Sequence, residues 1–469
     1  MTKDLASPSK ERFSTASSPP TSSSEVGRKT ELSAFGREEK EQYLEKATSS
    51  VCKLFHVWGF VVGAVISGEF SAFNVAYQYG LGSMIVAHVF TSLLMITVSL
   101  TLTELRQRCL LRSASYANAA FHGSVACIIG YAYTFDMIFI GAEVTNFVGV
   151  AFQTLFATDA KYNVLYWIAS VAVCSIINLS PKATLNTLVV LTTLSCLLVI
   201  IPFFAVARNF DFSTVFQTSI TMPDGTTGIS TDFLPFGLQG VVSMPCCVEE
   251  TTEIGKNVPR GMLAANLTLL LLSWIALLVT AGMPPGISSL EFAIFPFNNI
   301  FGTVFQLSNQ EAVSLISIPS VLASQLAIYY ACARYIYGMS RGGYMPPPLS
   351  LTTKNGAPVL DCDSFILQYS PDPNTLTIIN SAGTIFAMTA YIIHPLVYIR
   401  LNIKLPTLPR PFKHILAMVP LYITIGYIAL LPVYYFYIQK LLEDSPENCL
   451  KLASGKTSAR VETNQISTK

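Results

Sequence analysis

Long apolar runs separated by short polar segments fill most of the chain after residue 50. The runs lie at about 54–78, 83–103, 124–157, 164–180, 184–206, 232–252, 262–284, 312–339, 376–400 and 414–438. Most of them reach the ~20 residues that an α-helix needs to cross a bilayer. The pattern predicts an all-α, polytopic membrane protein with about ten spans.

The two ends of the chain are polar and lack this pattern. Residues 1–50 are rich in Ser, Thr, Pro, Lys and Glu, and they bury too little apolar surface to fold. We therefore expect a disordered cytoplasmic tail at 1–50, a transmembrane transporter domain at 51–440 and a polar C-terminal tail at 441–469.

The first apolar run, LFHVWGFVVGAVISGEFSAFNVAYQ, is interrupted at its centre by Ser-Gly-Glu. Glycine weakens a helix by about 1 kcal/mol relative to Ala, and a carboxylate at bilayer depth costs about 3 kcal/mol. Irregular backbone at this depth is tolerated where it lines a cavity or is buried in protein. The segment Gly63 to Gly68 is therefore predicted to be the broken helix of a transporter.

Composition and charge narrow the class of protein. The chain is 51% hydrophobic and only 12% charged, whereas soluble domains average about 25% charged residues. The net charge of +1 indicates no nucleic-acid partner. The ten cysteines lie mostly in apolar runs, and the pair Cys246-Cys247 has no second ligand pair at metal-binding spacing. No phosphate-binding GxxxxGK[ST] motif occurs, which argues against an ATP-driven pump. Only five His occur and they are scattered, which argues against an intramembrane enzyme.

Basic residues predict the orientation and expose one inconsistency. Lys and Arg follow the second, sixth and eighth runs, so the N-terminus is predicted to be cytoplasmic. The chain is predicted to be cytoplasmic after the eighth run and again in the basic loop from Arg400 to Lys413. Residues 357–375 lie between these points, but they contain three Asp and should not span the bilayer. One crossing is missing. Either 357–375 re-enters the bilayer, or the chain is a shortened isoform or an imperfect gene model, and we favour the last two.

Several motifs in order resemble one superfamily. They are GAVISGEF, ELRQRCLLRSASYANAAFHG, LPFGLQGVVSMPCCVEETTEIGKNVPRGM, ARYIYGMSRGGYMPPPL and LPTLPRPFK. Together they resemble the amino acid–polyamine–organocation (APC) superfamily of permeases, and VISGEFSAFN is most similar to its ethanolamine branch. The resemblance implies two inverted five-helix repeats with broken first and sixth helices, and here an incomplete second repeat.

The resemblance also implies where substrate binds. The predicted substrate-binding residues are Ile66, Ser67, Gly68, Glu69, Asp136, Gly237, Gln239, Gly240 and Val241. The sixth run could instead be a kinked packing helix with close-approach glycines. An amide at Gln239, where the family often has Glu, cannot carry a proton. Glu69 could also simply face water.

Four other ionisable residues have alternative interpretations. Asp136 and Glu143 are seven residues apart, so they share a helix face, either as functional groups or as a pair hydrogen-bonded between helices. Glu249 and Glu250 could gate the cytoplasmic side, or form an ion-pair network with nearby basic residues; Glu143 could join them in gating or coupling. Lys182 is expected to reach the interface.

The leading hypothesis is a secondary active transporter for amino acids or small amines such as ethanolamine, working by alternating access. A transporter-like amino acid sensor or a non-transporting shortened isoform is the alternative. No cofactor is expected, and proton or sodium coupling stays open. The expected partners are a small-molecule substrate and the lipid bilayer; no protein partner is indicated. The plasma membrane is favoured over an organellar one.

Overall fold

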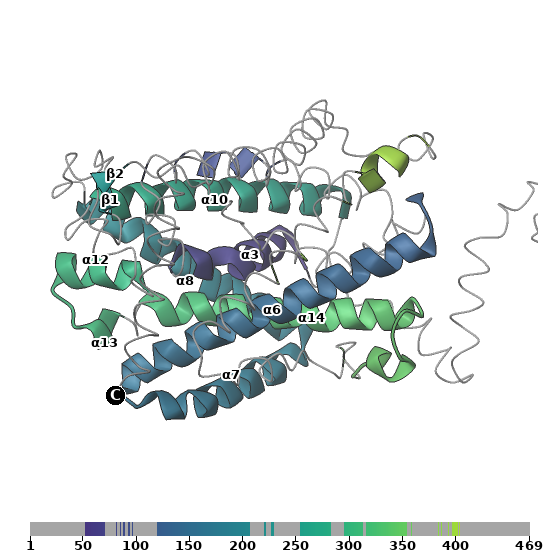
Figure 1. Ribbon diagram of the computed structural model, residues 1–469, viewed down its shortest axis with the longest axis horizontal. Helices are drawn as coiled ribbons and strands as arrows, with labels where there is room; N and C mark the ends of the chain where they lie inside the picture. The colour runs from purple at the N-terminus through teal and green to yellow at the C-terminus, as the bar shows by residue number, and fades with distance from the viewer. Residues whose placement is uncertain are drawn as a thin grey trace, which may run out of the picture. The chain divides into compact units, whose positions relative to one another are not determined.

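The computed structural model shows a bundle of long helices (Figure 1). It describes residues 52–70, 120–206, 220–221, 227–228, 254–282, 295–312, 316–353 and 396–401, with isolated positions elsewhere. The chain divides into two units, Met1–Ala47 and Thr48–Lys469, and the first lies outside the described residues.

The described elements are mainly α-helices. They are α3 (Leu54–Val65), α6 (Gly123–Phe156), α7 (Asn163–Asn178), α8 (Pro181–Val206), α10 (Ile254–Gly282), α12 (Pro296–Phe305), α13 (Asn309–Ala312) and α14 (Ile318–Arg341). Three 3-10 turns, η1 (Ile66–Glu69), η3 (Ala160–Tyr162) and η6 (Pro347–Ser350), and a two-residue antiparallel pair, β1 (Ile220–Thr221) with β2 (Thr227–Gly228), complete the set.

Helix α14 lies at the centre of the described bundle. It contacts α3, α6, α7 and α8 as well as the turn η1. Its buried face contains polar residues, among them Ser320, Ser324, Gln325 and Arg334. Because lipid offers polar groups no hydrogen bonds, a helix with this composition is stable only when other helices surround it.

Helix α3 is short and almost wholly apolar, and three helices surround it. It contacts α8, α10 and α14. The helix begins where the His56 ring accepts a hydrogen bond from the Lys53 backbone N–H, with 3.0 Å between Nδ1 and N. The largest apolar core includes Phe60, Val61 and Val62 of this helix, all fully buried. Helix α3 therefore lies within the apolar core of the described part.

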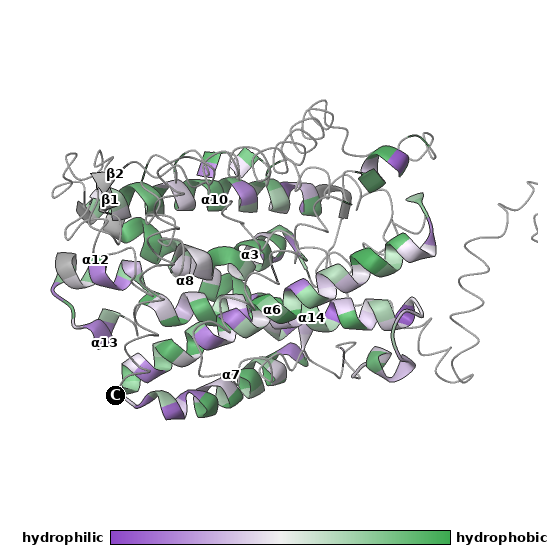
Figure 2. Cartoon of the chain, in the orientation of Figure 1, coloured by the Kyte–Doolittle hydropathy of each residue, from purple (hydrophilic) through white to green (hydrophobic). Residues whose placement is uncertain are grey.

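Most predicted spans coincide with helices of the structure. Four described helices are long and apolar enough to cross a membrane, at Gly123–Phe156, Ala160–Asn178, Pro181–Ile201 and Asn257–Gly282. Figure 2 shows hydrophobic residues along most of α7 and α8. The fold is helical, as predicted. The full number of spans is not determined, because the predicted spans at 83–103, 232–252, 376–400 and 414–438 lie wholly or largely outside the described residues.

Two predicted boundaries differ from the structure, and one helix pair was not predicted. The seventh span begins at Ile254 instead of 262, so Arg260 belongs to α10 and not to a loop. The eighth begins at Ile318 instead of 312. The segment before it forms the pair α12 and α13, which the apolar pattern did not predict; α12 begins with Pro296, a residue favoured at the first helical position.

Candidate functional site

The first apolar helix changes its backbone geometry at the predicted position. The last regular α-helical bond of α3 joins the Ile66 N–H to the Val62 carbonyl, and Ile66–Glu69 then form the 3-10 turn η1. The next α-helical bond would join the Ser67 N–H to the Gly63 carbonyl. Serine and glycine favour this change, because both are weaker helix formers than Ala.

The Ser324 hydroxyl of α14 occupies the place of that missing bond. The Ser67 N–H donates to Ser324 Oγ, with 3.1 Å between the two atoms. The same hydroxyl donates to the Gly63 carbonyl at 2.8 Å. Insertion of a side chain into the hydrogen-bond ladder is one of the identifiable causes of a helix break. We call this hydroxyl with its two bonds the Ser324 bridge.

Helix α3 is fixed on its other sides by α8 and α10. The Thr192 hydroxyl of α8 donates to the Gly59 carbonyl at 2.9 Å. The Trp58 ring N–H donates to the Thr268 hydroxyl of α10 at 3.1 Å. Gly59 and Gly63, four residues apart, allow α8 to approach closely, as small residues do between membrane helices.

The sequence predicted a break from Gly63 to Gly68, but Gly63 is not part of it. It lies in regular helix, where a Cβ would come within 2.6 Å of Thr192 Oγ1. Its carbonyl is nevertheless the first one released from the helical ladder, because it accepts from Ser324.

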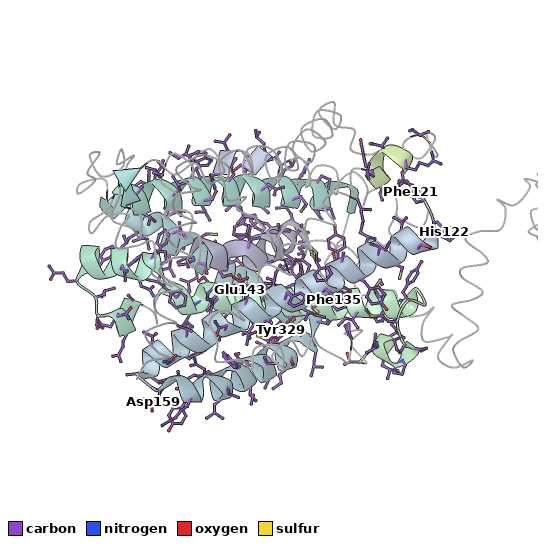
Figure 3. The ribbon with its side chains drawn as sticks, in the orientation of Figure 1. Phe121, His122, Phe135, Glu143, Asp159 and Tyr329 are labelled. Carbon is purple, nitrogen blue, oxygen red and sulfur yellow. The ribbon has the colours of Figure 1, made fainter. Side chains whose placement is uncertain are left out.

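A second polar group on α14 relates the break to the carboxylates of α6. Gln325, next to Ser324, donates to the Thr145 hydroxyl of α6 with 3.1 Å between Nε2 and Oγ1. Thr145 is therefore at about the height of the break. At about 1.5 Å per residue, Glu143 lies about 3 Å from this height and Asp136 about 13 Å from it. Figure 3 labels Glu143 along the middle of α6.

Asp136 is fully buried on the same helix. Neither carboxylate oxygen has a hydrogen-bond partner among the residues that the structure describes. Asp136, Phe139 and Glu143 follow one another at helical spacing along one stripe of α6. Phe139 stacks on Phe386, with 5.8 Å between ring centroids, so a segment from the late part of the chain lies beside this stripe.

A buried polar network joins α6, α7 and α14. Gln325 also donates to the Ser170 hydroxyl of α7 at 3.0 Å and accepts from the Cys174 thiol at 3.6 Å. The Thr145 and Tyr329 hydroxyls lie 2.7 Å apart. Hydrogen bonds of this kind hold membrane helices together, typically at about 0.6–2 kcal/mol each. The network fixes the rotation of α14 that aims Ser324 at the break.

Two titratable groups outside the spans have shifted pKa values. Ser308 donates its backbone N–H and its hydroxyl to Glu311, at 2.9 and 2.8 Å, and these bonds lower the pKa of the Glu311 carboxyl. Partial burial raises the pKa of Tyr344, just after α14. Neither group lies near the break.

Comparison with known proteins decides the family. A model of the amino acid permease family matches residues 53–448. The chain belongs to this family. Among solved structures, the permease matches a mutant manganese transporter from Eremococcus coleocola. The identity is 12%, the match covers 88% of this chain and 93% of that chain, and the TM-score is 0.50. A comparison with curated proteins finds no match.

These matches confirm the predicted class. The permease is a multi-pass membrane protein of the APC fold and a transporter, not an enzyme. At 12% identity the structural match concerns the fold alone.

The structure describes part of the predicted site of the permease. Ile66 and Ser67 are buried, and Gly68 is exposed. Glu69 ends η1, but its side chain is not described. The other predicted residues, Gly237, Gln239, Gly240, Val241, Glu249 and Glu250, lie outside the described residues. Lys182 is exposed at the start of α8, as an interfacial lysine would be.

Sequence reasoning missed the contribution of α14. Ser324 and Gln325 were not singled out, and neither was the buried Arg334, whose guanidinium lies over the Tyr330 ring at 4.7 Å. A signal was present, since Ser, Gln and Arg inside an apolar run point to contacts with other helices. The contact between Phe70 and Phe297 of α12, with ring centroids 5.5 Å apart, left no such signal.

Proposed function

We propose that the protein is a secondary active transporter that moves amino acids or small amines by alternating access. Substrate binds beside the open turn of the first helix, where backbone groups are free of the helical ladder. Within this proposal the membrane is the plasma membrane, the N-terminus is cytoplasmic, and residues 1–50 and 441–469 are tails outside the transporter domain 51–440.

The observation that carries the proposal is the open turn η1, whose geometry is stabilised by the Ser324 bridge. At its centre Gly68 is exposed, and a Cβ added there meets no described atom within 4 Å. An uninterrupted helix would suffice to anchor the protein in the membrane. The open turn instead supports a role in holding a small polar solute.

The finer assignment to amino acids or amines such as ethanolamine is supported by carboxylates near the break. Glu143 lies close to its height on α6, and Glu69 ends η1 itself. A carboxylate binds an ammonium group through charge-assisted hydrogen bonds, which are about twice as strong as neutral ones. A substrate with a primary amine fits this chemistry.

Uptake into proteoliposomes tests the proposal. The purified full-length chain should take up radiolabelled ethanolamine or at least one of a set of radiolabelled L-amino acids in a saturable manner. Uptake measured at two pH values, with and without sodium, identifies the coupling ion. Binding without uptake would indicate a sensor instead of a transporter. If the chain shows no binding and no uptake, both the transporter and the sensor hypotheses are refuted.

A variant at the break locates the substrate. Gly68→Leu should abolish saturable binding and uptake, since the leucine side chain fills the space beside the open turn. Val190→Leu is the matched control, because it adds bulk at an exposed position of α8. If the well-folded Gly68→Leu protein binds substrate as wild type does, substrate does not bind beside the open turn.

A further inference from the structure

Ser324 satisfies two backbone groups that would otherwise be orphaned by the open turn. The Ser67 N–H and the Gly63 carbonyl are the natural partners of one α-helical bond, and both are buried in protein. A buried backbone group without a partner costs about 1–3 kcal/mol. One hydroxyl that accepts from the first group and donates to the second removes both penalties. The turn can therefore stay open without loss of hydrogen bonding.

The hydroxyl is also held firmly in place. Gln325, the next residue of α14, bonds to Thr145 of α6 and to Ser170 of α7. Ser324 itself is fully buried. The bridge therefore joins the open turn of the first helix to α14, which is itself held by hydrogen bonds to α6 and α7.

The chemistry of position 324 decides which backbone geometry is favoured. Without the hydroxyl, the Ser67 N–H and the Gly63 carbonyl can satisfy each other through the α-helical bond. That direct bond extends α3 by one residue and removes the open turn. The side chain at 324 therefore selects between a closed and an open first helix.

We propose that Ser324 is a positioning residue of the transport site: its hydroxyl stabilises the open turn of the first helix and so sets the affinity for substrate. The proposal rests on the proposed function, which places substrate at this turn. Ser324 acts on the substrate through the backbone of residues 63–67 and not by direct contact.

A matched pair of serine variants tests the proposal. Ser324→Ala removes the bridge, whereas Ser320→Ala removes an equally buried hydroxyl of the same helix whose bond is local, to the Ser317 carbonyl at 2.8 Å. The probes are radiolabelled ethanolamine and a mixture of radiolabelled L-amino acids. Ser324→Ala should raise the KM about tenfold, which corresponds to about 1.4 kcal/mol, with kcat changed less. Ser320→Ala should leave both constants unchanged, and Ser324→Thr, which keeps the hydroxyl, should restore the low KM.

A reporter at the turn separates positioning from stability. A cysteine in place of Gly68 lies at an exposed position of the turn, so its rate of reaction with a thiol reagent, measured above the background of the parent chain, reports the local geometry. Adding Ser324→Ala should change that rate at least threefold, and adding Ser320→Ala should not.

The outcomes distinguish the two proposals. Equal KM values and equal labelling rates for the Ser324 and Ser320 variants would overturn the role of Ser324 while leaving transport intact. A wild-type chain that neither binds nor takes up the probes would refute the proposed function. The labelling comparison would then still show whether Ser324 sets the geometry of the turn.

Discussion

Two carboxylates on one stripe of α6 differ in their height relative to the open turn. Glu143 lies about 3 Å from the level of the break and Asp136 about 13 Å, measured along the helix axis. Only Glu143 is near enough in height to meet an ammonium group bound at the break. Asp136, buried without a described partner, needs a proton or a donor of its own. We therefore propose different roles for the two residues.

Charge-neutralising variants should separate these roles. Glu143→Gln should raise the KM for amine substrates about tenfold or more, because a hydrogen bond to a charged group contributes about 1.5–3 kcal/mol. Asp136→Asn should abolish accumulation driven by a pH gradient yet keep exchange of substrate across the membrane. Uptake, exchange and thermal stability are measured on the same preparations. If both variants transport normally with normal stability, neither residue belongs to the site.

A glycine beside the break serves packing and not substrate. Gly63→Ala brings a Cβ within 2.6 Å of Thr192 Oγ1, and displacing that side chain breaks its bond to Gly59. Overpacking costs about 1–3 kcal/mol and the lost hydrogen bond about 1 kcal/mol. The better helix propensity of Ala returns only about 1 kcal/mol. The variant should therefore unfold at a lower temperature than wild type.

Gly68→Ala is the matched control for this prediction, because no described atom lies within 4 Å of the added Cβ. Its melting temperature in detergent should equal that of wild type. Equal melting temperatures for the two alanine variants would show that α8 can move away from Gly63 without penalty.

At the scale of elements, the short helix α13 should respond to pH. The ionised Glu311 accepts two hydrogen bonds from Ser308, and these lower the pKa of Glu311 below that of an ordinary carboxyl group. The stabilisation is present above the ordinary carboxyl pKa and is lost as pH falls through the lowered one. Hydrogen-exchange protection of the Ser308 N–H should therefore drop at low pH. In the Glu311→Gln variant the glutamine side-chain oxygen accepts at every pH, so protection of the Ser308 N–H should not change in this range.

The apolar pattern predicted elements better than contacts. Length and composition alone located α6, α7 and α8 to within three residues at each end, because a bilayer demands about 20 apolar residues from every span. The break at residues 66–69 was predictable from Ser67 and Gly68, since both lower helix propensity. The pattern failed at α12 and α13, whose contacts with α6, α8 and α10 are tertiary and leave no periodic signal.

The site was less predictable for a related reason. The residue that stabilises the break, Ser324, is 257 positions away from Ser67 in the chain. No local rule connects a serine in one helix with a 3-10 turn that ends another. The height of Glu143 relative to the break likewise depends on the contact between Gln325 and Thr145, which only the packed bundle defines.

At the scale of the whole described bundle, basic residues gather at one end. The His56 ring and the Asn186 side chain are 3.0 Å apart, and a Cβ at Gly261 would meet Val57, so α3, α8 and α10 begin at the same end. Helix α14 runs opposite to α6, since Gly130 faces Met339 while Thr145 bonds to Gln325. The described basic residues at this end include Lys53, Lys182, Arg260 and Arg341.

The opposite end of the bundle is nearly neutral or acidic. Figure 3 shows His122 and Asp159 at opposite ends of α6. Lys161 forms an exposed ion pair with Asp159, with 2.8 Å between Nζ and the carboxylate oxygen, so its charge is balanced locally. Glu311 of α13 is also on this side, because α13 contacts α6 and directly precedes α14. From the positive-inside rule we predict that the end with the basic residues is cytoplasmic.

A pair of exposed positions tests this orientation. Lys182→Cys and Glu311→Cys place a thiol at opposite ends of the bundle, both on exposed side chains. A membrane-impermeant thiol reagent applied to intact cells should label Glu311→Cys and leave Lys182→Cys unlabelled until the cells are opened. The reverse pattern would invert the topology.

The direction of the late chain predicts where a further crossing lies. Gly383 lies against Phe139 of α6, whereas Phe386 packs on both Phe139 and Phe135. From Gly383 to Phe386 the contacts therefore move along α6 toward the end with the basic residues. Arg400 is 14 residues further along the sequence. Because Arg341 lies at this same end, we predict that the chain crosses the membrane once between Arg341 and Gly383, where most residues lie outside the described part. A glycosylation acceptor placed at about residue 405 should then stay unmodified. A modified acceptor would mean that the crossing is missing and that the second repeat is incomplete, as the polar segment 357–375 alone suggests.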